Sequence, residues 1–337
     1  MSKENISIGI IGAGAIARNI HLPCLARIEN IKVQAICDIE IDKAKNLANQ
    51  YGIPGVYALY REMLAEQNLD AVFVLTQPDQ IFRICLDCLE AGLDVFTEKP
   101  AGITAFQTHA LFRKAKERSA IMQVGLNRRY IPLLSHVADI MREQTRINQI
   151  NAYFVKHGDA SFYGGCASSF VCDTIHAIDT MLWLAGSRPV KAATMQGQYN
   201  SAVPNAWNAL IAFENGITGV LQANYNTGGR AHGIEIFGDT ISAYINLGFG
   251  SAACNAELIY NKNASFSLAS GGNSGTELER IDGIALAESN EYYVYYGYLK
   301  QNTEFIRSIR ERTTPLCSIE ESVKTMELVE MLLDSRI

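Results

Sequence analysis

A lysine between a glutamate and a proline is the first residue whose surroundings suggest chemistry. Lys99 lies in "DVFTEKPAG", where a short apolar run ends abruptly at Thr97-Glu98-Lys99-Pro100. A Glu-Lys-Pro sequence by itself is typical of a surface turn, because proline punctuates turns. At the end of a buried strand, however, a lysine could hold or move a proton. Its pKa starts at about 10.4 and falls on burial or beside another positive charge.

A glycine motif near the start of the chain indicates a phosphate site. The segment "ISIGIIGAGAIARNI" contains Gly12-x-Gly14-x-x-Ala17 directly after an apolar run and at the start of a helical pattern. Gly12 permits a tight turn, Gly14 lets the backbone approach a pyrophosphate, and Ala17 lets the helix pack on the strand. The amides of Ala15 and Ile16 would then face the phosphates at the positive end of the helix. In this context the motif predicts a dinucleotide-binding site.

An acidic residue at the end of the second apolar run indicates which dinucleotide binds. Asp38 follows the run "KVQAIC", and Ile39 and Glu40 come next, with no arginine. A carboxylate there accepts hydrogen bonds from a ribose 2′-hydroxyl and repels a 2′-phosphate. The sequence therefore favours NAD over NADP. A doubly wound domain that binds another nucleotide, or none, remains open.

The elements that must position these residues alternate between strand and helix in the first part of the chain. Such alternation predicts right-handed βαβ units around a parallel, doubly wound Rossmann sheet. Ligands bind at the carboxyl ends of such strands, where we expect Lys99 together with Thr76 and Pro78 of "LTQPDQ". The apolar runs are 6–11, 33–37, 71–75, 94–96 and 121–124, and the helical patterns are 15–28, 41–51, 79–91 and 104–118. A further helical pattern, 132–144, opens the second part of the chain.

The second part of the chain has a different pattern. Segments 205–214 and 217–225 alternate apolar and polar residues, which is typical of an antiparallel sheet with one covered face. Helices follow near 291–312 and 318–335. We therefore expect a Rossmann domain over 1–125 and an α+β domain over 126–337, with a mainly antiparallel sheet. We expect helices on one face of that sheet and a second subunit on the other, in a homodimer or homotetramer.

The motifs together resemble a known family. "GAGAIA", Asp38, "TQP", "EKPAG" and "GLNRRY" occur in the order and spacing of the Gfo/Idh/MocA family, which includes glucose–fructose oxidoreductase and inositol dehydrogenase. The resemblance covers nearly the whole chain, and "DTIHAIDTMLWLAG" is most similar to virulence-factor-like oxidoreductases. It implies that Lys99 contacts the nicotinamide ribose and the reacting hydroxyl, that Pro100 is cis, and that Glu98 and Asn127 lie near the cofactor.

The same resemblance points to a helix in the second domain. His176 and Asp179 match family positions, but Cys172 stands where the family has aspartate, and the carboxylate is at Asp173. Residues three and four apart are neighbours on a helix, so Asp173 could still orient His176. A lone helical histidine is otherwise more often structural.

These residues suggest the oxidation of a secondary alcohol of a sugar, polyol or sugar derivative. A proton must leave the hydroxyl for a group within hydrogen-bond reach, and histidine titrates near neutrality. We expect Lys99 and His176 to handle that proton, with Asp173 orienting the histidine. His157 and Tyr163 either line the substrate pocket or lie in solvated loops. A non-catalytic nicotinamide sensor, or an enzyme of a dihydrodiol or imine, remains an alternative.

The composition of the chain bears on its possible partners, its location and its cysteine chemistry. The chain has 337 residues, a net charge of −6 and no basic block, which argues against a nucleic-acid partner. No apolar run has the roughly 18–20 residues that span a bilayer, and no secretory signal precedes the first strand. The 8 cysteines are scattered, with one CxxC at Cys85 and Cys88, so we expect reduced thiols, no metal site and a cytoplasmic location. The Ser/Gly-rich stretch 262–276 is a surface loop or a lid.

Overall fold

The computed structural model describes residues 5–158, 161–162, 165, 167–248, 253–261 and 276–337. Contacts divide the chain into two compact units. Unit 1 contains the residues up to Asn127, a short stretch that ends at Ala167, and Gly297–Glu327. Unit 2 contains Arg128–Phe162, Ser168–Tyr296 and Leu328–Ile337.

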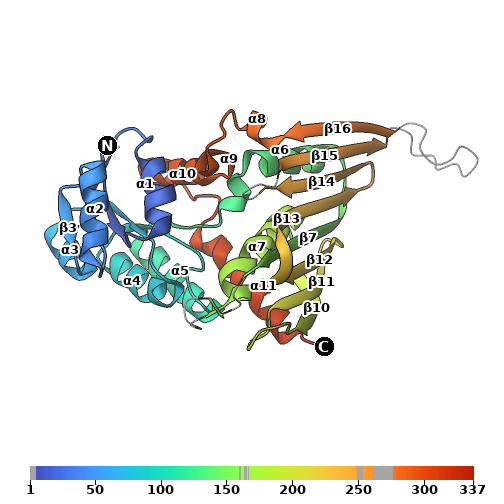
Figure 1. The fold of residues 1–337 in the computed structure, drawn as a ribbon, viewed down its shortest axis with the longest axis horizontal. Coiled ribbons are helices and arrows are strands. Elements are labelled where there is room, and N and C mark those ends of the chain that lie inside the picture. The colour runs from blue at the N-terminus through green and yellow to red at the C-terminus, as the bar shows by residue number, and fades with distance from the viewer. Residues whose placement is uncertain (1–4, 159–160, 163–164, 166, 249–252, 262–275) are drawn as a thin grey trace, which may run out of the picture. The chain divides into compact units, whose positions relative to one another are not determined.

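Unit 1 is built on a six-stranded parallel sheet in the order β3-β2-β1-β4-β5-β6 (Figure 1). This order, with strand connections made by helices, confirms the predicted Rossmann fold. The strands are β1 (Ile6–Ile11), β2 (Ile31–Cys37), β3 (Gly55–Tyr57), β4 (Ala71–Val74), β5 (Asp94–Thr97) and β6 (Met122–Val124). The helices are η1 (Ala17–His21), α1 (Leu22–Leu25), α2 (Ile41–Tyr51), α3 (Tyr60–Glu66), α4 (Pro78–Glu90), α5 (Ala105–Arg118) and α10 (Tyr298–Glu311). The short helix η2 (Asn127–Tyr130) begins with the last residue of this stretch, and its other residues belong to unit 2.

Helix α10 belongs to unit 1 although it comes late in the chain. Its Phe305 lies edge-on to Phe73, with ring centroids 5.4 Å apart, and Phe73 stacks on Phe96 at 4.7 Å. Ile306 and Ile309 join the same buried cluster. The sequence predicts a helix near 291–312 but does not indicate which sheet this helix covers. Residues 297–327 therefore lie with unit 1 here, whereas the sequence analysis placed them in the second domain.

Unit 2 is built on an eight-stranded sheet in the order β10-β11-β12-β7-β13-β14-β15-β16. All its pairs are antiparallel except β12 with β7, so the predicted mainly antiparallel sheet is confirmed. Helices α6 and α7 pack on one face. The strands are β7 (Ile147–His157), β10 (Pro189–Gly197), β11 (Ala206–Phe213), β12 (Thr218–Asn224), β13 (Asn226–Gly238), β14 (Ile241–Leu247), β15 (Cys254–Asn261) and β16 (Thr276–Asp282).

The remaining elements of unit 2 are short or helical. They are α6 (Pro132–Gln144), η4 (Phe170–Thr174), α7 (Ile175–Ala185), α8 (Gly283–Leu286) and α9 (Tyr292–Tyr295). Two-residue strands β8 (Ser161–Phe162) and β9 (Ala167–Ser168) precede η4. Helix α11 (Ile319–Asp334) begins in unit 1, and its residues from Leu328 onward belong to unit 2. Helix α7 ends at Gly186, whose φ of 57° is left-handed and suits a residue without a side chain. Within the described ranges, no helix is long and apolar enough to cross a membrane.

Candidate active site

The glycine turn after β1 leaves room where a phosphate would lie. Gly12 has a φ of 103°, and a Cβ there would come within 2.6 Å of the Leu75 carbonyl oxygen. A Cβ on Gly14, in contrast, would meet no atom within 4 Å. Gly12 is therefore required by the protein's own backbone, whereas the bare face of Gly14 is open to a ligand. Ala17 is fully buried, as expected for the contact between helix and strand.

Asp38 is held in place at the end of β2. Its Oδ2 accepts a hydrogen bond from the Ala13 amide at 2.7 Å, and its Oδ1 accepts one from the Glu40 amide at 2.8 Å. The carboxylate thus ties the glycine turn to the end of the second strand. It is half-buried and adjoins Ile39, whose side chain is 86% exposed. This is the geometry that an acidic ribose-binding residue needs.

The ends of β4 and β5 carry the other residues predicted for the cofactor. The Thr76 hydroxyl, just after β4, is buried and accepts or donates no hydrogen bond within the described chain. A buried hydroxyl normally has a partner, so this atom is available to a bound ligand. Pro78 is in the first turn of α4, and the Lys99–Pro100 bond after β5 is cis.

Glu98 joins Lys99 to a buried histidine. Its Oε2 accepts the Lys99 amide at 3.3 Å, and its Oε1 lies 3.2 Å from Nε2 of His21. His21 is fully buried, and its Nδ1 lies 3.1 Å from the side-chain nitrogen of Asn302. Burial alone would raise the pKa of Glu98, but the hydrogen bond and charge of His21, with Lys99, hold that pKa below its ordinary value. Glu98 therefore remains a carboxylate against the Lys99 backbone.

In unit 2, helices η4 and α7 present the predicted Asp173 and His176. Both side chains are buried, at 7% and 5% exposure. The Ser168 hydroxyl accepts the Val171 amide at 3.4 Å at the start of this helical segment. Asp179, one turn later, forms a buried bidentate pair with Arg129, with distances of 3.0 and 2.7 Å. Both side chains of this pair are 1% exposed.

The Asp173 carboxylate lies in a polar network. It forms an ion pair with Lys156 of β7, and the Tyr225 hydroxyl donates to its Oδ2 at 3.2 Å. Tyr225 also lies 2.9 Å from the Thr174 hydroxyl. Burial, and then the charge of Asp173, raise the pKa of Tyr225 well above its ordinary value, so the phenol stays protonated.

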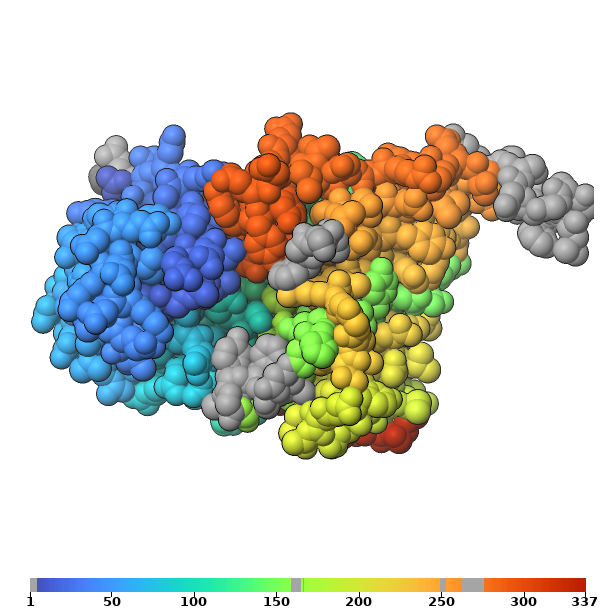
Figure 2. Space-filling view, in the orientation of Figure 1, coloured from blue at the N-terminus to red at the C-terminus, as the bar shows by residue number. Residues whose placement is uncertain are grey.

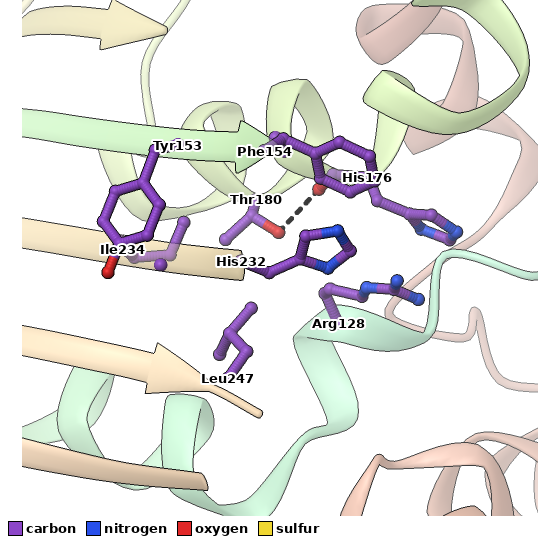
Figure 3. A pocket seen from close by; sticks show the side chains of 10 residues that line it. Arg128, Tyr153, Phe154, His176, Thr180, His232, Ile234 and Leu247 are labelled. Carbon is purple, nitrogen blue, oxygen red and sulfur yellow. Dashed lines mark hydrogen bonds between the residues drawn. The ribbon is translucent and has the colours of Figure 1, made fainter. Parts of the chain in front are cut away.

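A second histidine lies in the same unit and remains neutral. His232 of β13 stacks on Phe154 with ring centroids 3.8 Å apart, and its Nδ1 lies 3.4 Å from the Tyr296 hydroxyl. Burial, followed by the charges of Arg128 and Arg230, lowers the pKa of His232 to about 2. Arg128, His176 and His232 line one small cavity, and in Figure 3 their polar ends point to the same side.

The remaining predicted residues differ in how far the structure describes them. His157 ends β7 and is exposed; alternation along the strand places it on the face opposite Lys156. Asn127 is fully buried at the start of η2. Tyr163 and the stretch 262–275 lie outside the described residues. The substrate role of His157 and Tyr163 and the cofactor role of Asn127 remain predictions.

Several polar residues of unit 2 were missed by the sequence analysis. Lys156 was overlooked because it ends an apolar strand next to the more conspicuous His157. Arg230 and His232 lie on β13, Tyr225 directly precedes that strand, and the side chains that they contact are distant in sequence. Tyr296, in the tyrosine-rich segment 291–298, is fully buried, and the guanidinium of Arg128 lies 4.8 Å from its ring centroid.

The residues of unit 1 fit a nicotinamide dinucleotide. The open face of Gly14 leaves room for a pyrophosphate. The Thr76 hydroxyl oxygen is buried without a hydrogen-bond partner in the described chain, and Asp38 is fixed where a ribose would lie. The described cysteines are free thiols, including Cys85 and Cys88. Among the described residues, no group of three or more His, Cys, Asp or Glu side chains could hold a metal ion.

Two family models match the chain. The oxidoreductase family model with the NAD-binding Rossmann fold, GFO_IDH_MocA, matches residues 6–126. The GFO/IDH/MocA C-terminal domain model matches residues 157–244. Together they cover more than half of the chain and include the glycine turn, Lys99 and the helix of His176.

Individual relatives agree with this assignment at low identity. The chain is 26% identical over 257 residues to the uncharacterized oxidoreductase YrbE of Bacillus subtilis, covering 72% of this chain and 74% of that protein. It is 25% identical to trans-1,2-dihydrobenzene-1,2-diol dehydrogenase of Sus scrofa, over 63% of this chain and 65% of the relative. A solved dehydrogenase from Chromobacterium violaceum superposes with a TM-score of 0.87 at 18% identity, covering 99% of this chain and 96% of the other. That structure supports the fold.

Proposed function

Because the chain belongs to the GFO/IDH/MocA family of oxidoreductases, we propose that it is an NAD-dependent dehydrogenase of a secondary alcohol. The proposed substrate is a sugar, polyol or sugar derivative. The observation that carries the proposal is the set of groups at the strand ends of unit 1: the open Gly14 turn, the anchored Asp38 and the Glu98-supported Lys99. NAD is preferred to NADP in this proposal because Asp38 would repel a 2′-phosphate.

The proposed reaction has two parts, a hydride transfer and a proton transfer. NAD, held by the Gly14 turn and Asp38, would supply the acceptor for the hydride that leaves the carbinol carbon with both electrons of the C–H bond. The hydroxyl proton passes to a side chain of the protein, and the C–O bond becomes a carbonyl. We assign this proton to Lys99 and His176, following the family motifs, with Asp173 as a supporting carboxylate. Protonated Lys99 also stabilises negative charge that develops on the reacting oxygen.

The contacts within each unit support these roles. In unit 1 the Glu98 carboxylate accepts the Lys99 amide and so fixes the backbone from which the lysine side chain starts. In unit 2 the pair of Asp173 with Lys156 and the Tyr225 hydroxyl holds that carboxylate beside the helix of His176. Side chains fixed in this way lose little freedom when a substrate binds.

The open face of the unit 2 sheet supports a homo-oligomer. Its residues alternate with those that α6 and α7 cover, and they include the exposed Leu210, Tyr244 and Ile259. The β10–β12 (yellow-green) and β14–β16 (orange) ends of the sheet reach the surface in Figure 2. We propose that this face packs against a second copy in a homodimer or tetramer. The free thiols of the described cysteines support a cytoplasmic location.

A non-catalytic nicotinamide sensor is the second candidate. It is favoured by Cys172, fully buried at the position where the family has aspartate, and by the engagement of Asp173 with Lys156. A dehydrogenase of a non-sugar substrate is a third candidate, supported by the relative that is named a dihydrodiol dehydrogenase. Both would bind the same cofactor in unit 1.

A turnover screen tests the proposal. Purified protein is mixed with NAD or NADP and a panel of inositols, sugars, sugar acids and dihydrodiols, and the absorbance of reduced nicotinamide is followed. We expect turnover with NAD on at least one sugar or polyol. NAD binding without turnover on the panel would favour the sensor, and turnover on dihydrodiols alone would favour the third candidate.

A further inference from the structure

A series of hydrogen bonds runs through the core of unit 1 and ends at the Lys99 backbone. The side-chain nitrogen of Asn302 lies 3.1 Å from Nδ1 of His21, and Nε2 of His21 lies 3.2 Å from Oε1 of Glu98. The other carboxylate oxygen of Glu98 accepts the Lys99 amide at 3.3 Å. Asn302 belongs to α10 and His21 to η1, and α10 packs on η1 and α1 (Figure 1). The series thus connects a helix from late in the sequence to the lysine after β5.

The direction of these hydrogen bonds follows from the amide of Asn302. An amide nitrogen only donates, so Nδ1 of His21 accepts, and the ring hydrogen is on Nε2, where the Glu98 carboxylate accepts it. Protonation of Nδ1 as well would require the Asn302 amide to turn its oxygen towards the ring. That oxygen is buried and has no hydrogen-bond partner among the residues that the structure describes. His21 therefore donates to Glu98 in either protonation state.

Aromatic packing fixes the His21 ring. The ring is fully buried and lies edge-on to Phe96 of β5, with centroids 5.1 Å apart. Tyr298 of α10 also lies edge-on to it, with centroids 6.3 Å apart. A polar ring among aromatic side chains loses its hydration, and hydrogen bonds at both nitrogens offset that loss here. Packing and hydrogen bonds therefore favour the same ring orientation, in which Nε2 faces Glu98.

The Glu98 carboxylate is closely surrounded. Its side chain is 12% exposed, and a Cβ on Gly125 would come within 3.1 Å of its Oε1. Gly125 and His21 therefore both limit where the carboxylate can lie. Without the His21 donor, Oε1 would lose its hydrogen bond to the ring, and the carboxylate that binds the Lys99 amide would be held less firmly.

We propose that His21 is a positioning residue for Lys99 and that Asn302 holds His21 in the orientation this role requires. Donation from Nε2 keeps the Glu98 carboxylate against the Lys99 amide, which fixes the backbone from which the lysine side chain starts. The inference rests on the proposed function, in which Lys99 handles the hydroxyl proton. A misplacement of reacting groups by about 1 Å can slow a reaction about 100-fold, so loss of this donor should slow turnover although Lys99 is still present.

Two substitutions at position 21 test the assignment. In His21→Gln the terminal amide nitrogen reaches about as far as Nε2 and can donate to Glu98, whereas in His21→Asn the amide is one methylene shorter and does not reach it. Both variants put a neutral amide among the same aromatic rings, so each controls for the effect of the other on stability. With saturating NAD and the best substrate of the screen, kcat should fall about 10- to 100-fold in His21→Asn and stay within about 3-fold of wild type in His21→Gln.

The KM for NAD should be unchanged in both variants, because neither touches the Gly14 turn or Asp38. An equal loss of kcat in the two variants, with melting temperatures lowered alike, would make His21 a structural residue and overturn the proposal. Wild-type kcat in His21→Asn would overturn it as well.

Hydrogen exchange of the Lys99 amide tests the link without any substrate. The protein is labelled with 15N-lysine, and the Lys99 resonance is identified by its absence from Lys99→Arg. Exchange should be about 10-fold faster in His21→Asn than in the wild type and His21→Gln, because the acceptor of this amide is no longer held in place. If His21→Asn does not fold, Asn302→Leu gives the same test, since it removes the group that orients the ring. An unchanged exchange rate in the folded variant would contradict the assignment.

The two measurements separate this inference from the proposed reaction. Faster exchange in His21→Asn would support the link between His21 and Lys99 even if no compound were turned over, and then only the dehydrogenase proposal would fail. Turnover by the wild type, with unchanged exchange and unchanged kcat in His21→Asn, would leave the dehydrogenase intact and refute the positioning role.

Discussion

In unit 1 the residues proposed for the cofactor follow strands of one parallel sheet, whereas in unit 2 the polar residues come from elements far apart in the chain. Gly14, Asp38, Thr76 and Lys99 follow β1, β2, β4 and β5. Parallel strands bring their carboxyl ends to one edge, so sequence order alone brings these residues together. The unit 2 residues meet only because β7, β13 and the helix of His176 pack together. Local motifs therefore describe the first site, and tertiary packing creates the second.

The largest expected effect is a loss of stability when the buried Arg129–Asp179 pair of unit 2 is broken. Asp179→Ala leaves Arg129 buried without its carboxylate, both side chains being 1% exposed in the native pair. We expect the free energy of unfolding to fall by about 3–5 kcal/mol in urea denaturation. Glu214→Ala removes the partner of the exposed Arg188 and should cause no comparable loss. Equal effects of the two substitutions would show that packing in unit 2 does not depend on this pair.

In unit 1, substitution of Gly14 should lower cofactor affinity, whereas substitution of Gly12 should lower stability. Gly14→Val fills open space, so the melting temperature should be unchanged while NADH affinity, measured by fluorescence titration, falls about 100-fold through lost phosphate contacts. Gly12→Ala meets the Leu75 carbonyl at a φ of 103° and should lower the melting temperature. Normal NADH binding by Gly14→Val would place the cofactor elsewhere.

The contribution of the buried Glu98–His21 pair to the free energy of unfolding should depend on pH. Glu98→Gln replaces two acceptor oxygens by one acceptor and one donor, so it should cost about 1–3 kcal/mol of unfolding free energy at pH 7. The pKa of Glu98 is lowered in the folded protein, so its stabilising effect is present above the unfolded pKa of about 4.3. The difference between wild type and variant should shrink as pH falls below that value, through the folded pKa.

An exposed histidine–glutamate pair provides the control for this pH dependence. His109 and Glu327 lie 2.8 Å apart, with side chains 39% and 53% exposed. Glu327→Gln should therefore change the unfolding free energy by less than about 1 kcal/mol at pH 7. A Glu98→Gln effect that does not vary with pH would mean that the carboxylate charge is irrelevant to the Lys99 segment.

The smallest expected effect is on cofactor choice. Asp38→Asn removes the charge and keeps one oxygen to accept the Ala13 or Glu40 amide. We expect the preference for NAD over NADP, measured as a ratio of dissociation constants, to decrease about 10-fold. If the ratio did not change, another residue would determine the discrimination between the two cofactors.

The features that the sequence predicted correctly are those with local signals, and the features that it missed depend on tertiary packing. Helices 41–51 and 132–144 were predicted with the observed bounds, because apolar periodicity and flanking breakers are local signals. The parallel sheet followed from alternation. The helix near 291–312 was predicted within the second domain, whereas α10 groups with unit 1, because a helical pattern does not identify the surface that the helix covers. Lys156 and Arg230 were missed because the significance of a cation on a strand depends on residues that are distant in sequence.

The central claim is tested most directly by turnover of Lys99→Ala at saturating NAD with the best substrate of the screen. The account predicts a decrease in kcat of about 100- to 10,000-fold, because a group that handles the hydroxyl proton is lost. NADH should still bind, since the Gly14 turn and Asp38 are untouched. A variant that binds NADH and retains wild-type kcat would contradict the role of Lys99 and leave only the fold and the cofactor site.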